Sequence, residues 1–336
     1  MTAGPLLQIK NLRLSVRTDE GVAQILDHVE LSLSRGQILG VVGESGCGKS
    51  TLARAVLGIF PKAARIESGE IRYEGEDLLG LSDADLTRRV RGRRIGFIPQ
   101  DPYLALNPVF SIGTQLLAAL RWHAPSDLAS EAARRTQLVG LLRRVQLPEP
   151  EASLDRYPHQ FSGGQRQRLM IAGALASRPA LLIADEPTTA LDVTTQLQIL
   201  KLLKSLTQEF GVSMLFVTHD FGVVAQLCDV TTVMYAGQTV ETGPTPAVLA
   251  DPRHPYTQAL LACHPDRSQT LTGIPGLVPS PLAPPSGCRF TPRCRHAKDV
   301  CGARRSRLVL DAPAHLVSCR LADERHGIDP RQGLGA

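Results

Sequence analysis

The sequence predicts an α/β protein organised around a phosphate-binding loop. Three observations lead to this fold class: a short apolar run before a glycine-rich loop, a helical pattern directly after it, and later apolar runs that each end on a polar residue. The loop, Gly43 to Thr51, fits the pattern G-x-x-x-x-G-K-[ST]. Strand, loop and helix in this order suit a polyphosphate anion, because backbone N–H groups and a helix N-terminus point at one place.

Each residue type in the loop has an expected task. Glycines let the backbone come close to the phosphates, Lys49 is placed to reach the β- and γ-phosphates, and the Ser50 hydroxyl is placed to ligate Mg²⁺. The residues expected to surround the phosphates are Ser45, Gly46, Cys47, Gly48, Lys49, Ser50 and Thr51. The alternative is a glycine turn with no ligand, which explains neither the lysine nor the serine.

Composition limits the classes of protein. The chain has 336 residues, of which 43% are hydrophobic and 21% charged, as in a globular protein with a substantial core. No apolar run approaches the about 18–20 residues of a membrane span, and Met1 to Lys10 lacks the pattern of a secretory signal. We therefore expect a cytoplasmic protein that meets a membrane only through a partner. The basic run from Arg88 to Arg94 is interpreted as a solvated helix end in preference to a nucleic-acid or lipid contact.

Further elements follow from periodicity. Alternating or continuous apolar patterns predict strands at Leu7 to Lys10, Leu12 to Val16, Val29 to Leu33, Gly69 to Gly75 and Ile95 to Gln100. From Ile112 to Leu147 apolar residues recur at helical spacing, and Pro148 closes this block.

A second candidate anion contact lies at Ser162 to Gln165, which opens a helix running to about Ser177. Ser162 and Gln165 fit a capping box, which is a purely structural role. The pair Gly163-Gly164 costs helix stability, roughly 1 kcal/mol per glycine. Such a pair is useful where the backbone must approach an anion at a helix N-terminus.

Two apolar strands end on residues suited to phosphoryl transfer. Leu181 to Ala184 leads into Asp185 and Glu186, and Ser213 to Thr218 leads into His219. Asp185 would hold Mg²⁺, and Glu186 would orient or deprotonate the attacking water. Because ligands bind at the carboxyl ends of strands in open parallel sheets, these residues, Gln100 and the loop are expected to form one site. Surface carboxylates without a catalytic role are the alternative.

At this point the chain resembles the ATP-binding subunits of ABC transporters. Residues 5 to 255 carry six motifs in the family's order: the phosphate loop, Gln100, the signature Phe161 to Gln165, the strand ending at Asp185 with Glu186, Ala190 to Asp192, and His219. The resemblance implies a P-loop NTPase with a RecA-like core, an antiparallel β subdomain and a helical subdomain at about 102–177. We expect a nucleotide-binding domain at 1–255 and a C-terminal extension at 256–336.

The resemblance also implies a head-to-tail dimer that closes on two ATP molecules. Ser162, Gly163, Gly164 and Gln165 of one subunit would face the γ-phosphate held by Lys49 of the other. Catalysis is then expected from Glu186, His219, Lys49 and Gln100, and Mg²⁺ binding from Ser50, Gln100 and Asp185. Two departures are Phe161, where leucine is commoner, and Val16, where an aromatic residue usually stacks on adenine.

Longer motifs narrow the resemblance to the oligopeptide/dipeptide (and nickel) importer branch. They are Gly43 to Gly46, Gln100 to Pro108, His254 to Leu260, and the tail from Ile274 onward. The implied function is an ATPase that powers peptide uptake at the cytoplasmic face of the membrane. The implied partners are a second ATPase subunit, identical or paralogous, two permease subunits and an extracytoplasmic substrate-binding protein, with no nucleic acid. The alternatives are an importer of nickel or another small solute, an ABC ATPase acting on nucleic acid, and a non-catalytic partner subunit.

The tail contains four of the chain's seven cysteines after a proline-rich, irregular segment. They are Cys288, Cys294, Cys301 and Cys319. Four thiolates can hold zinc or an iron–sulfur cluster, and the spacing lacks the short knuckles typical of structural zinc. In the peptide-importer branch this tail is associated with a 4Fe–4S cluster in some members, so we expect a cluster ahead of zinc or free thiols. His296 and His315 are candidate replacement ligands that we interpret as bystanders.

Overall fold

The computed structural model describes residues 4–189, 191–263 and 273–326, which fall into two compact units. The first unit comprises Met1–Ser34, Ile38–Leu79 and Thr218–Ala336, and the second comprises Arg35–Gln37 and Gly80–Val217.

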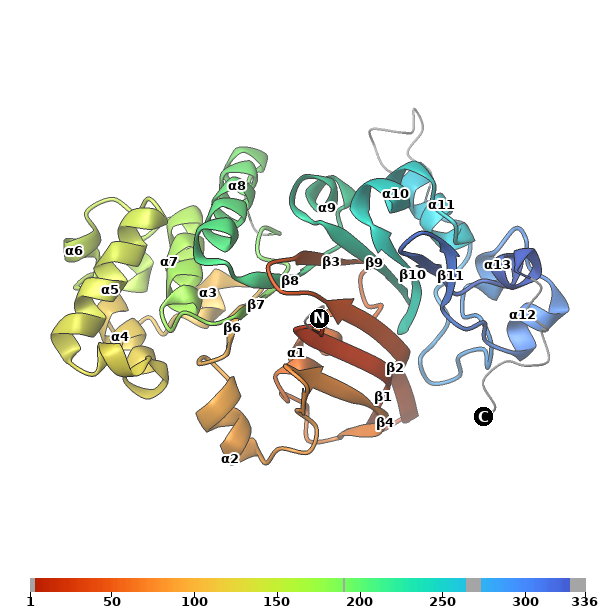
Figure 1. The fold of residues 1–336 in the computed structure, drawn as a ribbon, viewed down its shortest axis with the longest axis horizontal. Coiled ribbons are helices and arrows are strands. Elements are labelled where there is room, and N and C mark those ends of the chain that lie inside the picture. The colour runs from red at the N-terminus through yellow and green to blue at the C-terminus, as the bar shows by residue number, and fades with distance from the viewer. Residues whose placement is uncertain (1–3, 190, 264–272, 327–336) are drawn as a thin grey trace. The chain divides into compact units, whose positions relative to one another are not determined.

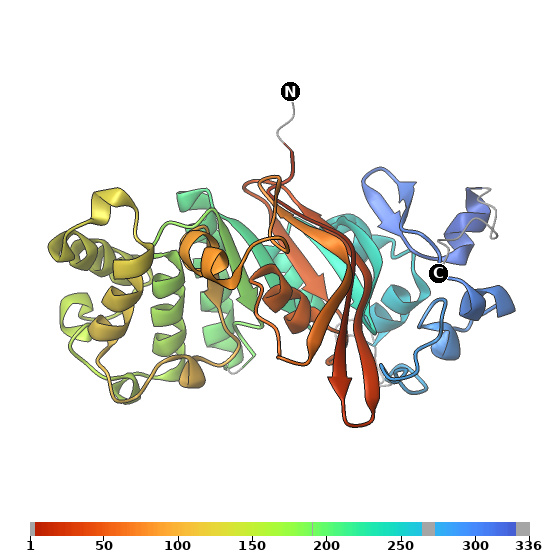
Figure 2. The same ribbon diagram turned by 90° about the horizontal axis from the view of Figure 1, so that it is seen from below.

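The first unit contains an antiparallel sheet in the order β2-β1-β4-β5. Its strands are β1 (Leu7–Thr18), β2 (Gly21–Leu33), β4 (Ala64–Tyr73) and β5 (Glu76–Asp77). Strands β1 and β2 run as a long hairpin whose register pairs Leu7 with Leu33 and Thr18 with Gly21 (Figure 2). The two strands predicted at Leu7 to Lys10 and Leu12 to Val16 are therefore one continuous strand.

The phosphate loop belongs to a second group of strands in the same unit. Strand β3 (Ile38–Val42) is parallel to β9 (Val230–Tyr235), which is followed by the antiparallel strands β10 (Gln238–Pro244), β12 (His315–Val317) and β11 (Val309–Ala312). All five residues of β3 are buried, as expected for a parallel strand covered on both faces. The helices of this unit are α1 (Lys49–Val56), α9 (Phe221–Leu227), α10 (Thr245–Ala250), α11 (Pro255–Ala262), α12 (Asp299–Ala303) and α13 (Arg320–Arg325).

The second unit combines three parallel strands with a group of helices. The strands are β6 (Ile95–Ile98), β7 (Leu181–Asp185) and β8 (Ser213–Thr218), paired β6 to β7 and β7 to β8. The helices are α2 (Asp83–Asp85), α3 (Pro102–Ala105), α4 (Ile112–His123), α5 (Glu131–Arg144), α6 (Pro150–Ser153), α7 (Gly163–Leu175) and α8 (Val193–Phe210). Helices α4 to α7 gather side by side (Figure 1), in the region predicted to be helical.

Helix α4 and helix α5 each begin at a serine cap. The hydroxyl of Ser111 accepts a hydrogen bond from the N–H of Thr114, and the hydroxyl of Ser130 accepts one from Ala133. Apolar residues spaced at helical periods, such as Leu116 and Leu120 on α4, are buried. The helical pattern predicted between Ile112 and Leu147 is therefore two capped helices, because the segment after His123 breaks the run.

The C-terminal segment is only partly irregular. Residues 273–285 contain no helix or strand, as predicted for the proline-rich stretch. Beyond them, β11 and β12 form a hairpin, and β12 pairs with β10 through Glu241 opposite Val317. The tail thus extends the strand group that carries the phosphate loop.

Candidate functional site

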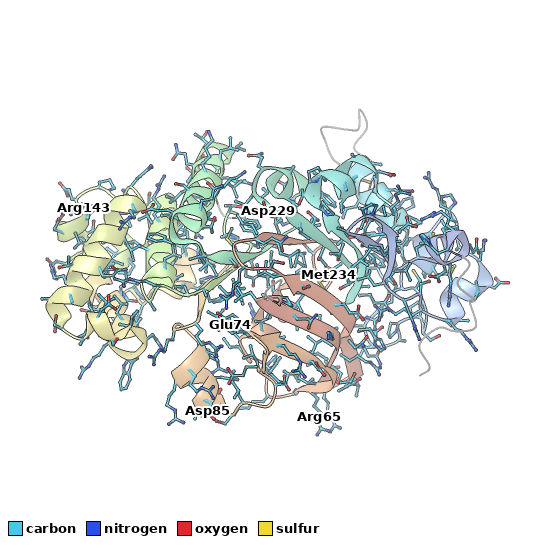
Figure 3. All side chains as sticks on the ribbon, in the orientation of Figure 1. Arg65, Glu74, Asp85, Arg143, Asp229 and Met234 are labelled. Atoms are coloured by element: carbon cyan, nitrogen blue, oxygen red, sulfur yellow. The ribbon has the colours of Figure 1, made fainter. Side chains whose placement is uncertain are left out.

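The phosphate loop connects the end of β3 to the first turn of α1. Gly46 and Gly48 have φ values of 80° and 100°, which residues with a side chain rarely adopt. Gly43 is required for a different reason: a Cβ there would lie 2.1 Å from the carbonyl oxygen of Met234 on β9 (labelled in Figure 3). The loop glycines therefore satisfy both backbone conformation and close packing.

Lys49 lies inside the loop. Its ammonium group donates to the carbonyl oxygens of Gly43 at 2.8 Å and Glu44 at 3.1 Å, and the residue is 4% exposed. The first turn of α1 contains no acidic residue, so the positive end of the helix dipole is not offset there. Lysine and helix N-terminus together make an electropositive pocket suited to phosphate.

The other loop residues expected at the phosphates differ in their exposure. Ser45 and Gly46 are exposed, whereas Ser50 and Thr51 are half-buried in the first turn of α1. The Cys47 side chain is buried, and this burial raises the pKa of its thiol, a shift that the charge of Lys49 partly offsets. Cys47 can therefore offer its backbone, rather than its thiol, to an anion.

The predicted catalytic carboxylate lies in the second unit, at the end of β7. Asp185 is 1% exposed, and Glu186 follows it with a φ of 45°. Oε2 of Glu186 accepts a hydrogen bond from Thr189 Oγ1 at 2.9 Å and lies 3.5 Å from Nε2 of Gln100. The structure thus brings Gln100, Asp185 and Glu186 to one edge of the β6–β7–β8 sheet.

His219 belongs to the first unit, together with Lys49 and Ser50. It follows β8 and is exposed, and the next residue, Asp220, caps α9 by accepting a hydrogen bond from the N–H of Gly222 at 2.7 Å. Ala190, in the motif Ala190 to Asp192, lies outside the described residues, while Asp192 caps α8.

Ser162 to Gln165 opens α7 with the predicted capping box. The Ser162 hydroxyl accepts from the N–H of Gln165, and the Ser162 N–H donates to Oε1 of Gln165 at 2.9 Å. Packing supplies a second reason for the glycine pair: a Cβ on Gly163 would lie 3.0 Å from Tyr103 Oη, and one on Gly164 would lie 2.8 Å from Thr195 Cγ2. Phe161 is 5% exposed, so its side chain packs in the interior.

The four tail cysteines line one cavity of about 20 Å³ in the first unit, together with His254 and Phe290. Burial raises the pKa of Cys288 to about 11 and that of Cys319 to about 12. His296 also lines the cavity, whereas Nε2 of His315 is hydrogen-bonded to Oε1 of the buried Glu241 at 2.7 Å. Nevertheless, among the described residues no group of three or more His, Cys, Asp or Glu side chains is placed to hold a metal ion.

Three residues that the sequence interpretation did not assign surround the start of the loop: Glu44, Tyr256 and Arg293. The N–H of Glu44 donates to the Tyr256 hydroxyl at 2.9 Å, and the Glu44 carboxylate accepts from Arg293. All three fall within or beside motifs used for the resemblance, but separations of 212 and 249 positions give no local signal of contact.

Comparison with known proteins fixes the family. The family model "ABC transporter" matches residues 26–189, and the model "Oligopeptide/dipeptide transporter, C-terminal region" matches residues 240–301. The oligopeptide transport ATP-binding protein OppD of Bacillus subtilis is 45% identical over 300 residues, covering 88% of this chain and 83% of OppD. The dipeptide transport ATP-binding protein DppD of Escherichia coli is 40% identical over 317 residues, covering 94% of this chain and 96% of DppD.

The chain belongs to the ABC transporter ATPases. Solved structures agree with this assignment: the ATP-binding cassette MJ0796 bound to ADP and Pi matches with a TM-score of 0.62 and 28% identity. The match covers 71% of this ABC ATPase and 98% of MJ0796. The predicted P-loop NTPase fold is confirmed, and as a member of this family the chain binds and hydrolyses ATP. Across the described part of this ABC ATPase, no helix has the length and apolar character needed to cross a membrane.

Proposed function

We propose that this ABC ATPase is the ATP-hydrolysing subunit of an importer for dipeptides and oligopeptides. The observation that carries the proposal is the pairing, on one chain, of the ABC transporter match at 26–189 with the peptide-transporter C-terminal match at 240–301. The relatives with known names agree, since OppD and DppD are peptide-transport ATP-binding proteins.

The site residues divide the chemistry of hydrolysis among them. Lys49 and the loop N–H groups bind the β- and γ-phosphates, with Ser45, Gly46, Cys47, Gly48, Ser50 and Thr51 around them. Ser50, Gln100 and Asp185 offer the oxygen ligands that Mg²⁺ prefers, and the bound ion would neutralise phosphate charge. Glu186 orients or deprotonates the attacking water, while Thr189 and Gln100 hold its carboxylate by hydrogen bonds. His219 contributes from the segment after β8.

A second ATPase subunit, identical or paralogous, completes each site. Ser162, Gly163, Gly164 and Gln165 of one subunit present a capped helix N-terminus to the γ-phosphate held by the other. The first turn of α7 carries no acidic residue that would repel this phosphate. ATP then joins the two subunits, and its hydrolysis releases them, which supplies the motion that a permease requires.

The remaining partners are two membrane permease subunits and an extracytoplasmic substrate-binding protein. The ATPase would act at the cytoplasmic face of the membrane as a peripheral subunit. The stretch after Gln100 suits a permease helix because Tyr103, Leu104, Val109 and Phe110 are at least half exposed, at 51%, 86%, 70% and 50%. Such exposed apolar side chains are candidates for contact with a partner protein when they form one patch.

Peptide uptake in cells that carry the matching permease tests the proposal. Cells lacking this ATPase are expected to lose uptake of a labelled dipeptide, the wild-type gene should restore it, and the Glu186→Gln variant should not. Nickel uptake measured in the same cells addresses the alternative substrate, which the peptide-transport relatives do not favour. Loss of nickel uptake with normal peptide uptake would overturn the peptide assignment.

We propose that the four tail cysteines hold an iron–sulfur cluster, and the alternatives are a zinc ion and free thiols. In its favour, Cys288, Cys294, Cys301 and Cys319 share one cavity, and Nε2 of the buried His254, also on that cavity, has no hydrogen-bond partner among the residues that the structure describes. Against it, the cavity of about 20 Å³ has room for about one water molecule, so a four-iron cluster would require the thiols to move apart. Metal analysis and visible absorbance of anaerobically purified protein distinguish these alternatives. Zinc without iron would overturn the cluster assignment.

A further inference from the structure

An ion pair joins the phosphate loop to the C-terminal tail within the first unit. Nη1 of Arg293 donates to Oε2 of Glu44 at 2.8 Å, and Nη2 donates to Oε1 at 3.2 Å. The guanidinium and the carboxylate therefore form a bidentate pair with two hydrogen bonds. The Arg293 side chain is 4% exposed, and the Glu44 side chain is 27% exposed. A bidentate pair with one partner buried is the strong form of this interaction, unlike a flexible surface ion pair.

The guanidinium is held in place by its own surroundings. Besides Glu44, it donates to the carbonyl oxygen of Ile274 at 2.9 Å, to that of Pro275 at 3.1 Å, and to the hydroxyl of Tyr235 at 3.2 Å. All three of its nitrogens therefore donate to fixed acceptors, and Arg293 remains charged at any pH at which the protein is folded. Its position is set by the tail and by β9, independently of Glu44.

Glu44 is held on three sides. Its N–H donates to Tyr256 on α11, its carboxylate accepts from Arg293, and its carbonyl oxygen accepts from Lys49 Nζ at 3.1 Å. The same backbone carbonyl also accepts from the N–H of Cys47 at 3.2 Å. The residue that opens the loop after Gly43 is thus bonded both to the phosphate-binding lysine and to two residues of the C-terminal third.

Electrostatics gives this arrangement a role beyond packing. Glu44 places a negative charge at the start of a loop that must receive a triphosphate, and this charge repels the negative charges of the phosphates. Arg293 cancels that charge while fixing the backbone that carries it. We propose that Arg293 is a positioning residue of the ATP site, which acts through Glu44 so that the C-terminal tail tunes nucleotide affinity. This inference rests on the proposed role of the loop in ATP binding.

Binding of a fluorescent ATP analogue by the full-length protein tests the inference. Arg293→Ala is expected to raise the Kd about tenfold, which is the effect of one uncancelled charge at a distance of about 12 Å from a phosphate charge when the effective dielectric is about 20. Glu44→Gln leaves the positive charge of Arg293 uncancelled, so by the same argument it should lower the Kd relative to wild type. The double variant Glu44→Gln with Arg293→Ala should recover most of the lost affinity.

Arg295→Ala is the matched control, because Arg295 lies on the other side of Cys294, is exposed, and contacts His296 at 3.1 Å. It should bind the analogue as wild type does. If Arg293→Ala does not fold, Arg293→Lys, which keeps the charge and loses the fork, should show a smaller rise in Kd.

Two results overturn the inference. The first is a folded Arg293→Ala protein that binds the ATP analogue with the wild-type Kd. The second is a double variant, Glu44→Gln with Arg293→Ala, whose Kd is as high as that of Arg293→Ala, which would mean that Arg293 has a purely structural role. Lys49→Ala separates this outcome from failure of the proposed function. If Lys49→Ala loses binding while Arg293→Ala keeps it, only the positioning role fails. If Lys49→Ala binds as wild type does, the loop assignment itself fails.

Discussion

Nε2 of Gln100 lies 3.5 Å from Oε2 of Glu186, at the ends of the neighbouring strands β6 and β7. The same carboxylate oxygen accepts a shorter hydrogen bond, 2.9 Å, from Thr189. Both side-chain donors therefore contact the same carboxylate oxygen of Glu186. This relationship connects the residue expected to bind Mg²⁺ to the residue expected to activate water.

Replacement of Glu186 by glutamine removes the proposed base while keeping the shape and the two hydrogen-bond contacts. We expect ATP turnover to fall by about 10²–10⁴-fold, the usual contribution of a general base, and ATP affinity to stay near wild type. Phosphate release and nucleotide binding measure the two quantities. Normal turnover in Glu186→Gln would remove this residue from the mechanism.

Ser162 offers a way to separate a helix cap from a phosphate contact. Ser162→Ala should lower the free energy of unfolding by about 1 kcal/mol, because the N–H of Gln165 loses its acceptor. Ser162→Asp keeps an acceptor and should retain stability, but its charge would repel the γ-phosphate of the partner site.

We therefore expect Ser162→Asp to abolish ATP-dependent dimer formation in a Glu186→Gln background. Urea titration measures stability, and light scattering after gel filtration measures the dimer. A Ser162→Asp protein that dimerises with ATP as well as its parent would show that the signature serine does not face a phosphate.

Gly43→Ala tests the close approach of the loop to β9. The new Cβ would fall 2.1 Å from the carbonyl oxygen of Met234, so β9 or the loop must shift, at a cost of roughly 1–3 kcal/mol. Gly140→Ala is the control, because Gly140 is not in the left-handed region and the nearest atom to its added Cβ, Nη1 of Arg144, lies 3.7 Å away. Thermal unfolding should rank Gly43→Ala clearly below Gly140→Ala, and equal stabilities would contradict the packing argument.

Cys47 should react slowly with alkylating reagents although it lies in the phosphate loop. Burial raises the pKa of its thiol, and the thiolate is the reactive form. At pH 8 we expect iodoacetamide to modify the partly exposed Cys263 before Cys47, as followed by mass spectrometry of peptides. Unfolding in urea should equalise the two rates. Equal rates in the folded protein would show that the thiol is accessible, and Cys47→Ser identifies its peptide.

Local sequence patterns predict most of the elements of the fold and most of the candidate site residues. The phosphate loop, the strand before Asp185 and the cap at Ser162 are each specified by a short stretch of residues, and the structure has them where the sequence predicts. Helix α8 is missing from the elements expected above, although Ile199, Leu202, Leu203 and Leu206 follow helical spacing and are buried. That signal was present in the sequence.

Other features leave no local pattern. Strand β12 has three residues and is recognisable through its pairing with β10 and β11 rather than through its sequence. The contact of Glu44 with Arg293 joins positions 249 residues apart, and charge alone does not select one arginine among many. For the same reason, the spacing of the tail cysteines did not reveal that they share a cavity of so small a volume.

The pairing of β12 with β10 has a practical consequence for anyone who shortens this protein. A chain ending after Ala262 would uncover one side of β10, whose backbone would then be free to recruit a strand from a neighbouring molecule. Such a truncated ATPase is expected to aggregate during purification. The resulting loss of activity could then be mistaken for evidence that the missing segment takes part in the reaction.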